Sequence, residues 1–373
     1  MAALPLPRGR IKTTPEDFLV DEIPAYEPSG QGDHVYVHFR KRGLTTDEAV
    51  RSIVRALGVP PRETGVAGMK DKVAVTTQWL SVLSRDPETE ARARALALDG
   101  IEILDVKRHG NKLRTGHLRG NRFTLVVREV PAEAFEDVRA AFDRIAKEGV
   151  PNAFGTQRFG RDGDNAERAK AWLTGKEKAP GDPRLRRLHF SAWQSAIFNA
   201  VLAARVEDRT WTVPIDGDLL KKEETGGIFV CSDVQTDRER AERGELCPTG
   251  PIVGDKMRWP EREALALEER IAAPFVEGID LRRARSLGEG TRRPLRLRVT
   301  ETSFEELMKS PESPDFQEQG RAFRVRFVLP KGAYATTVLG NAVSVTEAAQ
   351  NTSPLGSIGV AADTSDDSLE PDE

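Results

Sequence analysis

Cysteine is scarce in this sequence: Cys231 and Cys247 are the only two among 373 residues. A small disulfide-stapled domain needs several cysteines, and a structural zinc site usually pairs them about two to four residues apart. The two cysteines here fit neither pattern. Both are therefore predicted to be ordinary thiols.

Histidine is sparse as well, with five residues. The closest pair, His34 and His38, falls in the segment HVYVHF, where apolar and polar residues alternate. Such alternation indicates a strand rather than a helix that presents metal ligands. We therefore expect no metal site.

Motifs that bind nucleotide cofactors are also missing. The segment GVAGMKD, residues 65–71, has glycines and a lysine but lacks the GxxxxGK[ST] spacing of a phosphate-binding loop. The residues after it indicate a strand, where that loop requires a helix. The motif GxGxxG is absent too, so the sequence predicts no cofactor.

Long hydrophobic runs do not occur, and no stretch approaches the roughly 20 apolar residues of a membrane-spanning helix. The first residues, MAALPLPRGRIKTT, place a short apolar patch before the basic residues, which is the reverse of a secretory signal. We expect a cytoplasmic protein with no membrane role. Its length suits two domains of roughly 100 to 200 residues each.

The net charge of −3 hides an uneven distribution. The last 23 residues contain six acids and no bases, and without those six acids the net charge becomes +3. Bases cluster elsewhere, in residues 107–128 and 282–298. This local surplus is typical of a protein that binds a polyanion, although solvated charged faces would give the same pattern.

Residue patterns predict alternating strands and helices. Strands are expected around residues 10–40, from about 73, and on both sides of a basic loop within 101–130. Helices are expected from Thr45 or Thr46 to Gly58, at 132–148, from about 185, and over PEREALALEERIAA. Two further strands follow residue 294, and the tail after residue 350 is expected to be disordered.

A short charged turn, Gly68 to Lys72, is the sharpest local feature. Asp71 stands between Lys70 and Lys72, and nearby cations favour an ionised carboxylate that could act as a nucleophile or a general base. The alternative is a surface turn with alternating charges.

A second segment, NAFGTQRFG, combines an amide, aromatic rings and a guanidinium. Asn152 could bond the edge of an unstacked base while Phe154 offers a flat apolar face, or the segment could be a loop anchored by core phenylalanines. Phe18 and Tyr334 are further aromatics beside turns, and most such residues belong to the core.

Six separated segments, in order and at similar spacing, resemble the TruD family of tRNA pseudouridine synthases over residues 10–340. The segments are TPEDFLVDE, AGMKDKVAVTTQW, GNRFTLVVR, VPNAFGTQRFG, FSAWQSAIFN and LPKGAYATTVL. The resemblance implies an α+β fold: a pseudouridine synthase catalytic domain, with an antiparallel sheet flanked by helices, and an inserted α/β domain in a V-shaped molecule. The expected limits are 1–180 and 299–350 for the catalytic domain, 181–298 for the insertion and 351–373 for the tail.

The resemblance also implies the roles of single residues. Asp71 matches the nucleophilic aspartate, and Lys12 matches the basic residue that pairs with it. Phe18, Tyr334, Asn152 and Phe154 match positions around the target uracil. The implied reaction breaks the C1′–N1 bond of uridine, most plausibly uridine 13 of tRNA, rotates the flipped base and rejoins it through C5.

The expected partner is tRNA, with no metal, membrane or obligate protein partner. Charge alone suggests which cations contact the RNA backbone: Lys70, Lys72, Arg108, Lys112, Arg114 and Arg158. Gly340, Asn341 and Ala342 stand where the family more usually has an Arg-Glu pair, which removes any role of that pair here. The rival functions are a noncatalytic RNA-binding or chaperone protein and a metal-dependent nuclease.

Overall fold

The computed structural model describes residues 5–307 and 320–347, so the tail expected to be disordered lies outside the described residues. The chain divides into two compact units, one of Met1–Lys147 with Val299–Glu373 and one of Glu148–Arg298. Across the described residues, no helix is long and apolar enough to cross a membrane.

The first unit combines a large sheet with four α-helices in its described part. Its strands are β1 (Arg8–Ile11), β2 (Phe18–Pro24), β3 (His34–Arg42), β4 (Thr64–Val66), β5 (Val75–Leu83), β6 (Ile101–His109), β7 (Leu118–Val130), β14 (Thr300–Leu307), β15 (Arg321–Pro330) and β16 (Ser344–Glu347). Its helices are α1 (Thr46–Leu57), α2 (Glu88–Arg94), α3 (Phe135–Glu148) and α8 (Ala335–Leu339).

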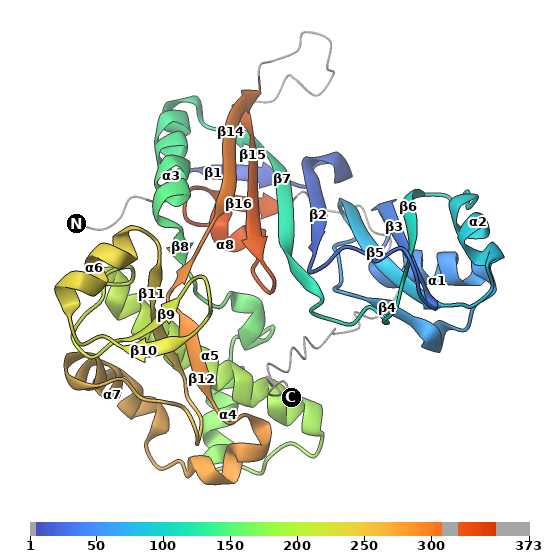
Figure 1. Cartoon of the computed structure of the whole chain (residues 1–373). Helices are drawn as coiled ribbons and strands as arrows, with labels where there is room; N and C mark the ends of the chain where they lie inside the picture. Colours follow the sequence, from blue (N-terminus) through green and yellow to red (C-terminus); the bar gives the residue numbers. More distant parts are fainter. Residues whose placement is uncertain (1–4, 308–319, 348–373) are drawn as a thin grey trace. The chain divides into compact units, whose positions relative to one another are not determined.

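The strands of this unit form one ten-stranded sheet with the central order β14-β15-β7-β2-β5-β3-β6. Most neighbours are antiparallel, as expected, but β2 runs parallel to β5 and β1 runs parallel to β16. Figure 1 shows the late strands β14, β15 and β16 beside the early β1 and β7. The two ends of the described chain therefore meet in one sheet.

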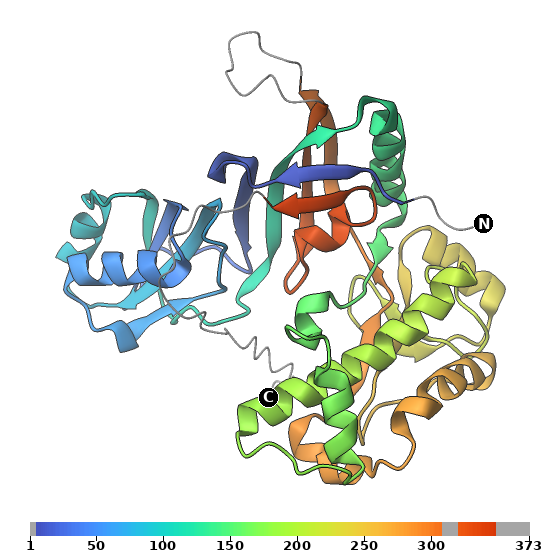
Figure 2. The same cartoon turned by 180° about the vertical axis from the view of Figure 1, so that it is seen from behind.

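Helix α1 covers the part of the sheet that contains β3 and β5, as seen from behind in Figure 2. Its inner residues Ala49 and Ile53 are fully buried in one cluster with Val35, Phe39 and Leu80 of β3 and β5. Local signals define both ends of this helix, because Thr45 caps its first turn and Gly58 ends it at a φ of 69°. The predicted helix is confirmed.

The second unit is built around one long helix. Its helices are α4 (Asn165–Leu173), α5 (Pro183–Glu207), α6 (Val234–Glu242) and α7 (Arg262–Val276). Its strands are β8 (Val150–Pro151), β9 (Leu219–Lys222), β10 (Ile228–Val230), β11 (Leu246–Ile252), β12 (Thr291–Pro294) and β13 (Arg296–Leu297). Strands β10, β9, β11 and β12 form an antiparallel sheet, and α5 buries Phe190, Trp193 and Ile197 in the core.

The division between the units differs from the expected limit at residue 180. The structure separates the units after Lys147, and α4 belongs to the second unit. Ala166 and Ala169 of α4 are buried in the same core as Phe190 and Trp193 of α5, so the segment 175–182 is a connection inside that unit. The later division between the units lies after Arg298.

A candidate active site around Asp71

Asp71 lies on the loop between β4 and β5 in the first unit, and its side chain is 58% exposed. Buried side chains hold the backbone of this loop from beneath. Gln78 Nε2 donates to Gly68 O over 3.3 Å, and Lys70 N donates to Thr46 Oγ1 over 2.8 Å. Thr46 in turn donates to Gln78 Oε1, so two side chains joined to each other grip the loop at two points. An exposed carboxylate thus stands on a backbone that cannot easily move.

A third hydrogen bond holds the backbone of Asp71 itself. Lys41 Nζ donates to Asp71 O over 2.6 Å and to Leu44 O over 2.6 Å. Lys41 is fully buried on the side of β3 that faces α1, although the sequence analysis gave it no role. The available signal was its position, because residues 35, 37 and 39 of the alternating strand point inward and 41 continues that series.

The flanking lysines do not pair with Asp71. Lys70 forms a buried ion pair with Glu22, 2.7 Å between Nζ and Oε2, with side-chain exposures of 5% and 1%. Lys72 lies 3.5 Å from Glu48 at the surface. Lys70 is therefore unavailable to an RNA backbone, contrary to the sequence-based expectation, because the chain turns its side chain inward.

The cation that lies beside the Asp71 carboxylate comes from far along the chain. Lys12 Nζ lies 3.5 Å from Asp71 Oδ2 and 2.7 Å from Glu347 Oε1, and its side chain is 11% exposed. Lys12 has a φ of 56°, an unusual left-handed conformation for a residue that is not glycine. The two side chains that were expected to pair thus lie together, with Glu347 as a second acceptor that the sequence did not reveal.

The aromatic candidates of this unit differ from each other. Phe18 is 4% exposed, packs edge-on against Phe123, and has Lys12 Nζ 4.8 Å from its ring centre. Tyr334 precedes α8 and is 49% exposed. Among the described residues, no hydrogen bond or ring contact joins Tyr334 to Lys12, Phe18 or Asp71.

The other two candidates belong to the second unit. The Asn152 side chain already has partners, because Nδ2 donates to Pro294 O and Oδ1 accepts from Arg293 Nη2 over 2.6 Å. Two guanidinium groups lie near the Phe154 ring, with Arg293 Cζ 4.2 Å and Arg158 Cζ 5.3 Å from its centre. Burial, together with Arg158, lowers the pKa of Arg293 to about 10. No pattern in the sequence marks Arg293 as a site residue.

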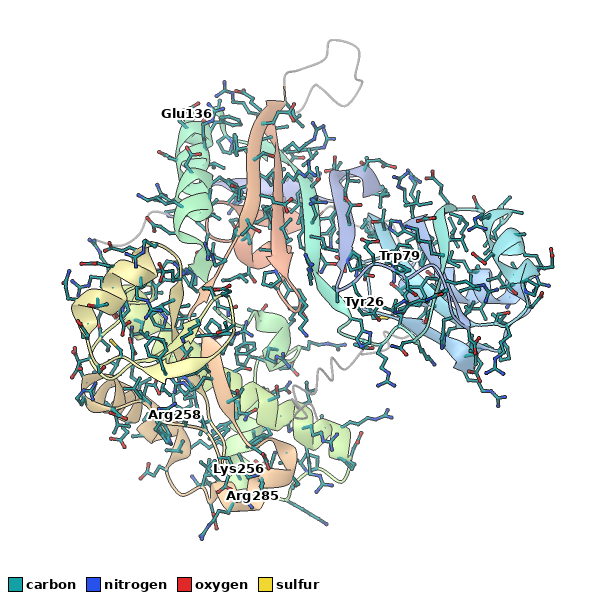
Figure 3. The ribbon with its side chains drawn as sticks, in the orientation of Figure 1. Tyr26, Trp79, Glu136, Lys256, Arg258 and Arg285 are labelled. Carbon is teal, nitrogen blue, oxygen red and sulfur yellow. The ribbon has the colours of Figure 1, made fainter. Side chains whose placement is uncertain are left out.

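Many of the bases that suggested a polyanion partner are engaged in ion pairs. In residues 282–298, Arg285 pairs with Asp255, and Arg292 is buried against Glu268. Figure 3 shows Arg285 and Lys256 near one another in the second unit, where Lys256 pairs with Glu289. This segment therefore carries less free positive charge than its sequence suggests.

The same holds for part of residues 107–128. Arg108 pairs with Glu90 and donates to three backbone carbonyls, so its role is structural, and Lys112 donates to Arg62 O. Arg114 is exposed and forms no ion pair with any described residue. Arg114 is thus a better candidate for an RNA contact than Arg108.

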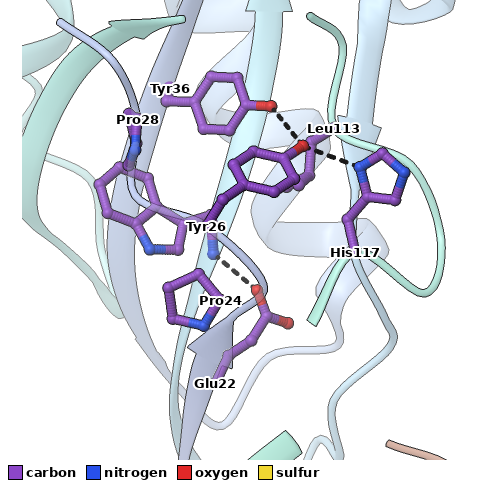
Figure 4. A pocket seen from close by; sticks show the side chains of 8 residues that line it. Glu22, Pro24, Tyr26, Pro28, Tyr36, Leu113 and His117 are labelled. Carbon is purple, nitrogen blue, oxygen red and sulfur yellow. Dashed lines mark hydrogen bonds between the residues drawn. The ribbon is translucent and has the colours of Figure 1, made fainter. Parts of the chain in front are cut away.

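A small cavity and a larger open groove lie among the described residues of the first unit. The smaller, about 10 Å³, is a tight cavity lined largely by aromatic side chains. Within it the Tyr26 hydroxyl and His117 Nδ1 share a hydrogen bond of 2.8 Å (Figure 4). The larger is an open groove of about 440 Å³ between α1, β4 and residues 112–115. No group of three His, Cys, Asp or Glu residues suited to a metal ion occurs in the described ranges.

Comparisons with known proteins agree with each other. The sequence matches the family described as tRNA pseudouridine synthase D (TruD) over residues 3–179 and 165–341. A protein named tRNA pseudouridine synthase D from Anaeromyxobacter sp. strain Fw109-5 is 47% identical, over 91% of this chain and 93% of its own. One from Thermus thermophilus, with the same name, is 39% identical over 92% of this chain and 90% of its own.

A solved structure shares the fold. The crystal structure of a Methanosarcina mazei protein named for the same family aligns with a TM-score of 0.75 at 24% sequence identity. The alignment covers 91% of this chain and 94% of that one. At this identity the likeness concerns the fold alone.

Proposed function

The chain belongs to the TruD family of tRNA pseudouridine synthases and is an isomerase that converts uridine to pseudouridine in tRNA; from that premise we propose that Asp71 is its nucleophile. The observation that supports this role most directly is an exposed carboxylate on a loop held at Gly68, Lys70 and Asp71 by buried side chains. A nucleophile held in one place reacts faster because less motion is lost on the way to the transition state.

The reaction needs one carboxylate and one rotation of the base. Asp71 attacks C1′ of the uridine, so that a carboxylate–C1′ bond forms as the C1′–N1 bond breaks, and the freed uracil anion turns within the site. C5 of the uracil then attacks C1′ and displaces the Asp71 carboxylate, the proton on C5 leaves, and N1 gains a proton, so that the product is an isomer and Asp71 is regenerated. Lys12 Nζ, 3.5 Å from Asp71 Oδ2, places a positive charge beside the attacking carboxylate.

We propose uridine 13 as the target, released from its stack before it reacts. Tyr334 is the aromatic with the free surface needed to stack on a uracil. The Phe18 ring lies 4.8 Å from Lys12 Nζ, and we propose that Phe18 acts on the base through that cation. In the second unit, Asn152 holds Arg293 beside Phe154, and we propose that Asn152 and Phe154 also contact the RNA substrate. Arg158 and Arg293 together supply positive charge without a described carboxylate partner.

The proposed enzyme works in the cytoplasm without metal, cofactor or obligate protein partner. The chemistry moves no hydride and transfers no phosphate, so a carboxylate with a nearby cation suffices. Exposed cations such as Lys72 and Arg114 would contact the RNA backbone.

The decisive experiment measures pseudouridine in an unmodified tRNA transcript, in the presence of a chelator. Wild type, Asp71→Asn and the exposed-helix control Asp143→Asn are compared on transcripts with uridine or cytidine at position 13. We expect product from wild type and the control only, and only with uridine 13. Equal product from Asp71→Asn would overturn the nucleophile, and product from the cytidine transcript would overturn the target position.

A further inference from the structure

Lys41 is a buried ionisable group that the reaction described above does not use. Its two hydrogen bonds, each 2.6 Å, go to the backbone carbonyls of Leu44 and Asp71. In the described part of the chain it forms no ion pair with a carboxylate, and its exposure is 0%. An ammonium group in that position keeps its charge in a place where charge is costly.

The cost is visible in the acidity of this group. The pKa of Lys41 is lowered to about 8. Burial is the largest cause and the charge of Lys70 acts in the same direction, whereas the charges of Asp71 and Glu48 oppose the shift. A methionine of similar length would avoid that cost. Groups that a fold retains against local stability are expected mainly at functional sites.

We propose that Lys41 is a positioning residue for the nucleophile: its buried ammonium holds the Asp71 backbone in place and supplies positive potential behind the Asp71 carboxylate. This inference rests on the proposed role of Asp71. Leu44, the other acceptor, lies immediately before the Thr45 cap of α1, so Lys41 ties the reactive loop to the start of that helix.

Every charged group that faces Lys41 can be named. Asp71 and Lys70 belong to the loop, and Glu48 lies in the first turn of α1. Beyond them, Lys12 contacts Asp71 and Lys72 contacts Glu48. The charge of Lys41 is predicted to disappear between pH 7 and pH 9, because burial lowers its pKa to about 8.

The direction of the pH effect follows. Below pH 8 the ammonium is present and the loop is held, whereas above it the neutral amine keeps a donor but loses the potential. The kcat of wild type should therefore fall above pH 8, by about tenfold for each further pH unit if the charge is essential. Lys41→Arg keeps its charge throughout, so its kcat should stay level to pH 10.

The test measures kcat and KM on a tRNA transcript from pH 6 to pH 10 for wild type, Lys41→Met and Lys41→Arg. Lys147→Met, which changes an exposed lysine on α3, is the matched control. At pH 7 we expect Lys41→Met to lower kcat by about 100-fold, as for a slightly misplaced nucleophile, with KM for tRNA nearly unchanged. The control should match wild type at every pH.

The outcomes separate this inference from the proposed function. The role of Lys41 would be overturned if Lys41→Met kept the kcat of wild type, or if kcat of Lys41→Arg still fell at alkaline pH. In either case an inactive Asp71→Asn would leave the proposed nucleophile in place. An active Asp71→Asn would overturn both. If thermal melting shows that Lys41→Met does not fold, the comparison of wild type with Lys41→Arg decides alone.

Discussion

At the scale of single residues, the two lysines that flank Asp71 look equivalent in the sequence but lie in different environments. Lys70 is buried against Glu22, whereas Lys72 is exposed beside Glu48. A buried ion pair that loses one partner leaves an uncompensated charge, but an exposed pair contributes little.

We therefore predict losses of stability of very different size for two matched substitutions. Lys70→Met should lower the free energy of unfolding by about 3–5 kcal/mol, and Lys72→Met by less than about 1 kcal/mol. Urea unfolding measures both. Adding Glu22→Gln to Lys70→Met should recover part of the loss, and a Lys70→Met variant as stable as wild type would contradict the buried pair.

The sequence draws attention to Asp71 because its neighbours form a compact charged motif, and the family resemblance led us to expect Lys12 beside it, but neither Glu347 nor Lys41 was expected. Lys12 reaches the site from one end of the described chain and Glu347 from the other. Lys41 looks like one base among several in FRKRG, and its burial depends on how α1 covers the sheet. Charge patterns describe residues along the chain and do not reveal which ones fold inward.

At the scale of elements, β4 brings the chain to the reactive loop and passes very close to a neighbour. A Cβ at Gly65 would lie 1.9 Å from Leu113 O, far inside contact distance. Strand β4 pairs with β5 through Gly65 and Ser81, and Ser81 Oγ accepts from Leu113 N, so the three segments are tightly joined. Only glycine fits at this position.

A methyl group there should disturb both stability and catalysis. We predict that Gly65→Ala lowers the free energy of unfolding by about 1–3 kcal/mol, the usual cost of overpacking. It should also lower kcat, because β4 must shift and the loop begins two residues later. Thermal melting and turnover of a tRNA transcript measure the two effects. Gly110→Ala, where nothing lies within 4 Å, should match wild type.

Elements with local signals were predictable, whereas pairings were not. Helix α1 begins after a capping threonine and ends at a glycine, and both signals lie within its own sequence. By contrast, the parallel pairing of β2 with β5 joins Leu19 to Val75, and no local pattern specifies it. The segment RPLRLR also formed two very short strands, β12 and β13, rather than the start of the last strand pair.

At the scale of the whole molecule, positive charge is distributed less freely than composition implies. Most arginines of 282–298 have acidic or carbonyl partners, while Arg114 has no ion pair in the described ranges. Binding of RNA releases counterions only where a free cation meets a phosphate.

Salt dependence tests this distribution. For wild type, the logarithm of the tRNA association constant should fall linearly with the logarithm of salt concentration. Arg114→Ala should reduce the slope by about 0.7–0.9, the share of one phosphate contact, whereas Arg285→Ala should leave it unchanged because Asp255 already neutralises that side chain. A larger change with Arg285→Ala would restore 282–298 as the binding surface.

Two units could be predicted from length, but their first limit could not. The Pro- and Gly-containing segment near residue 180 has the composition of a linker, yet it joins α4 and α5 within one core. The composition of a segment indicates that it is exposed to solvent. It does not indicate whether the helices on its two sides pack in the same unit or in different ones.

The parallel pairing of β1 with β16 also has a consequence for biosynthesis. Arg8 faces Ser344 and Ile11 faces Glu347, and Glu347 is the closer of the two acid partners of Lys12. A ribosome makes the whole of the second unit, Glu148–Arg298, after β1 and before β16. The strand that carries the chain to Lys12 therefore waits for its partner until the second unit has been synthesised. The Glu347 carboxylate cannot reach Lys12 before that point of translation.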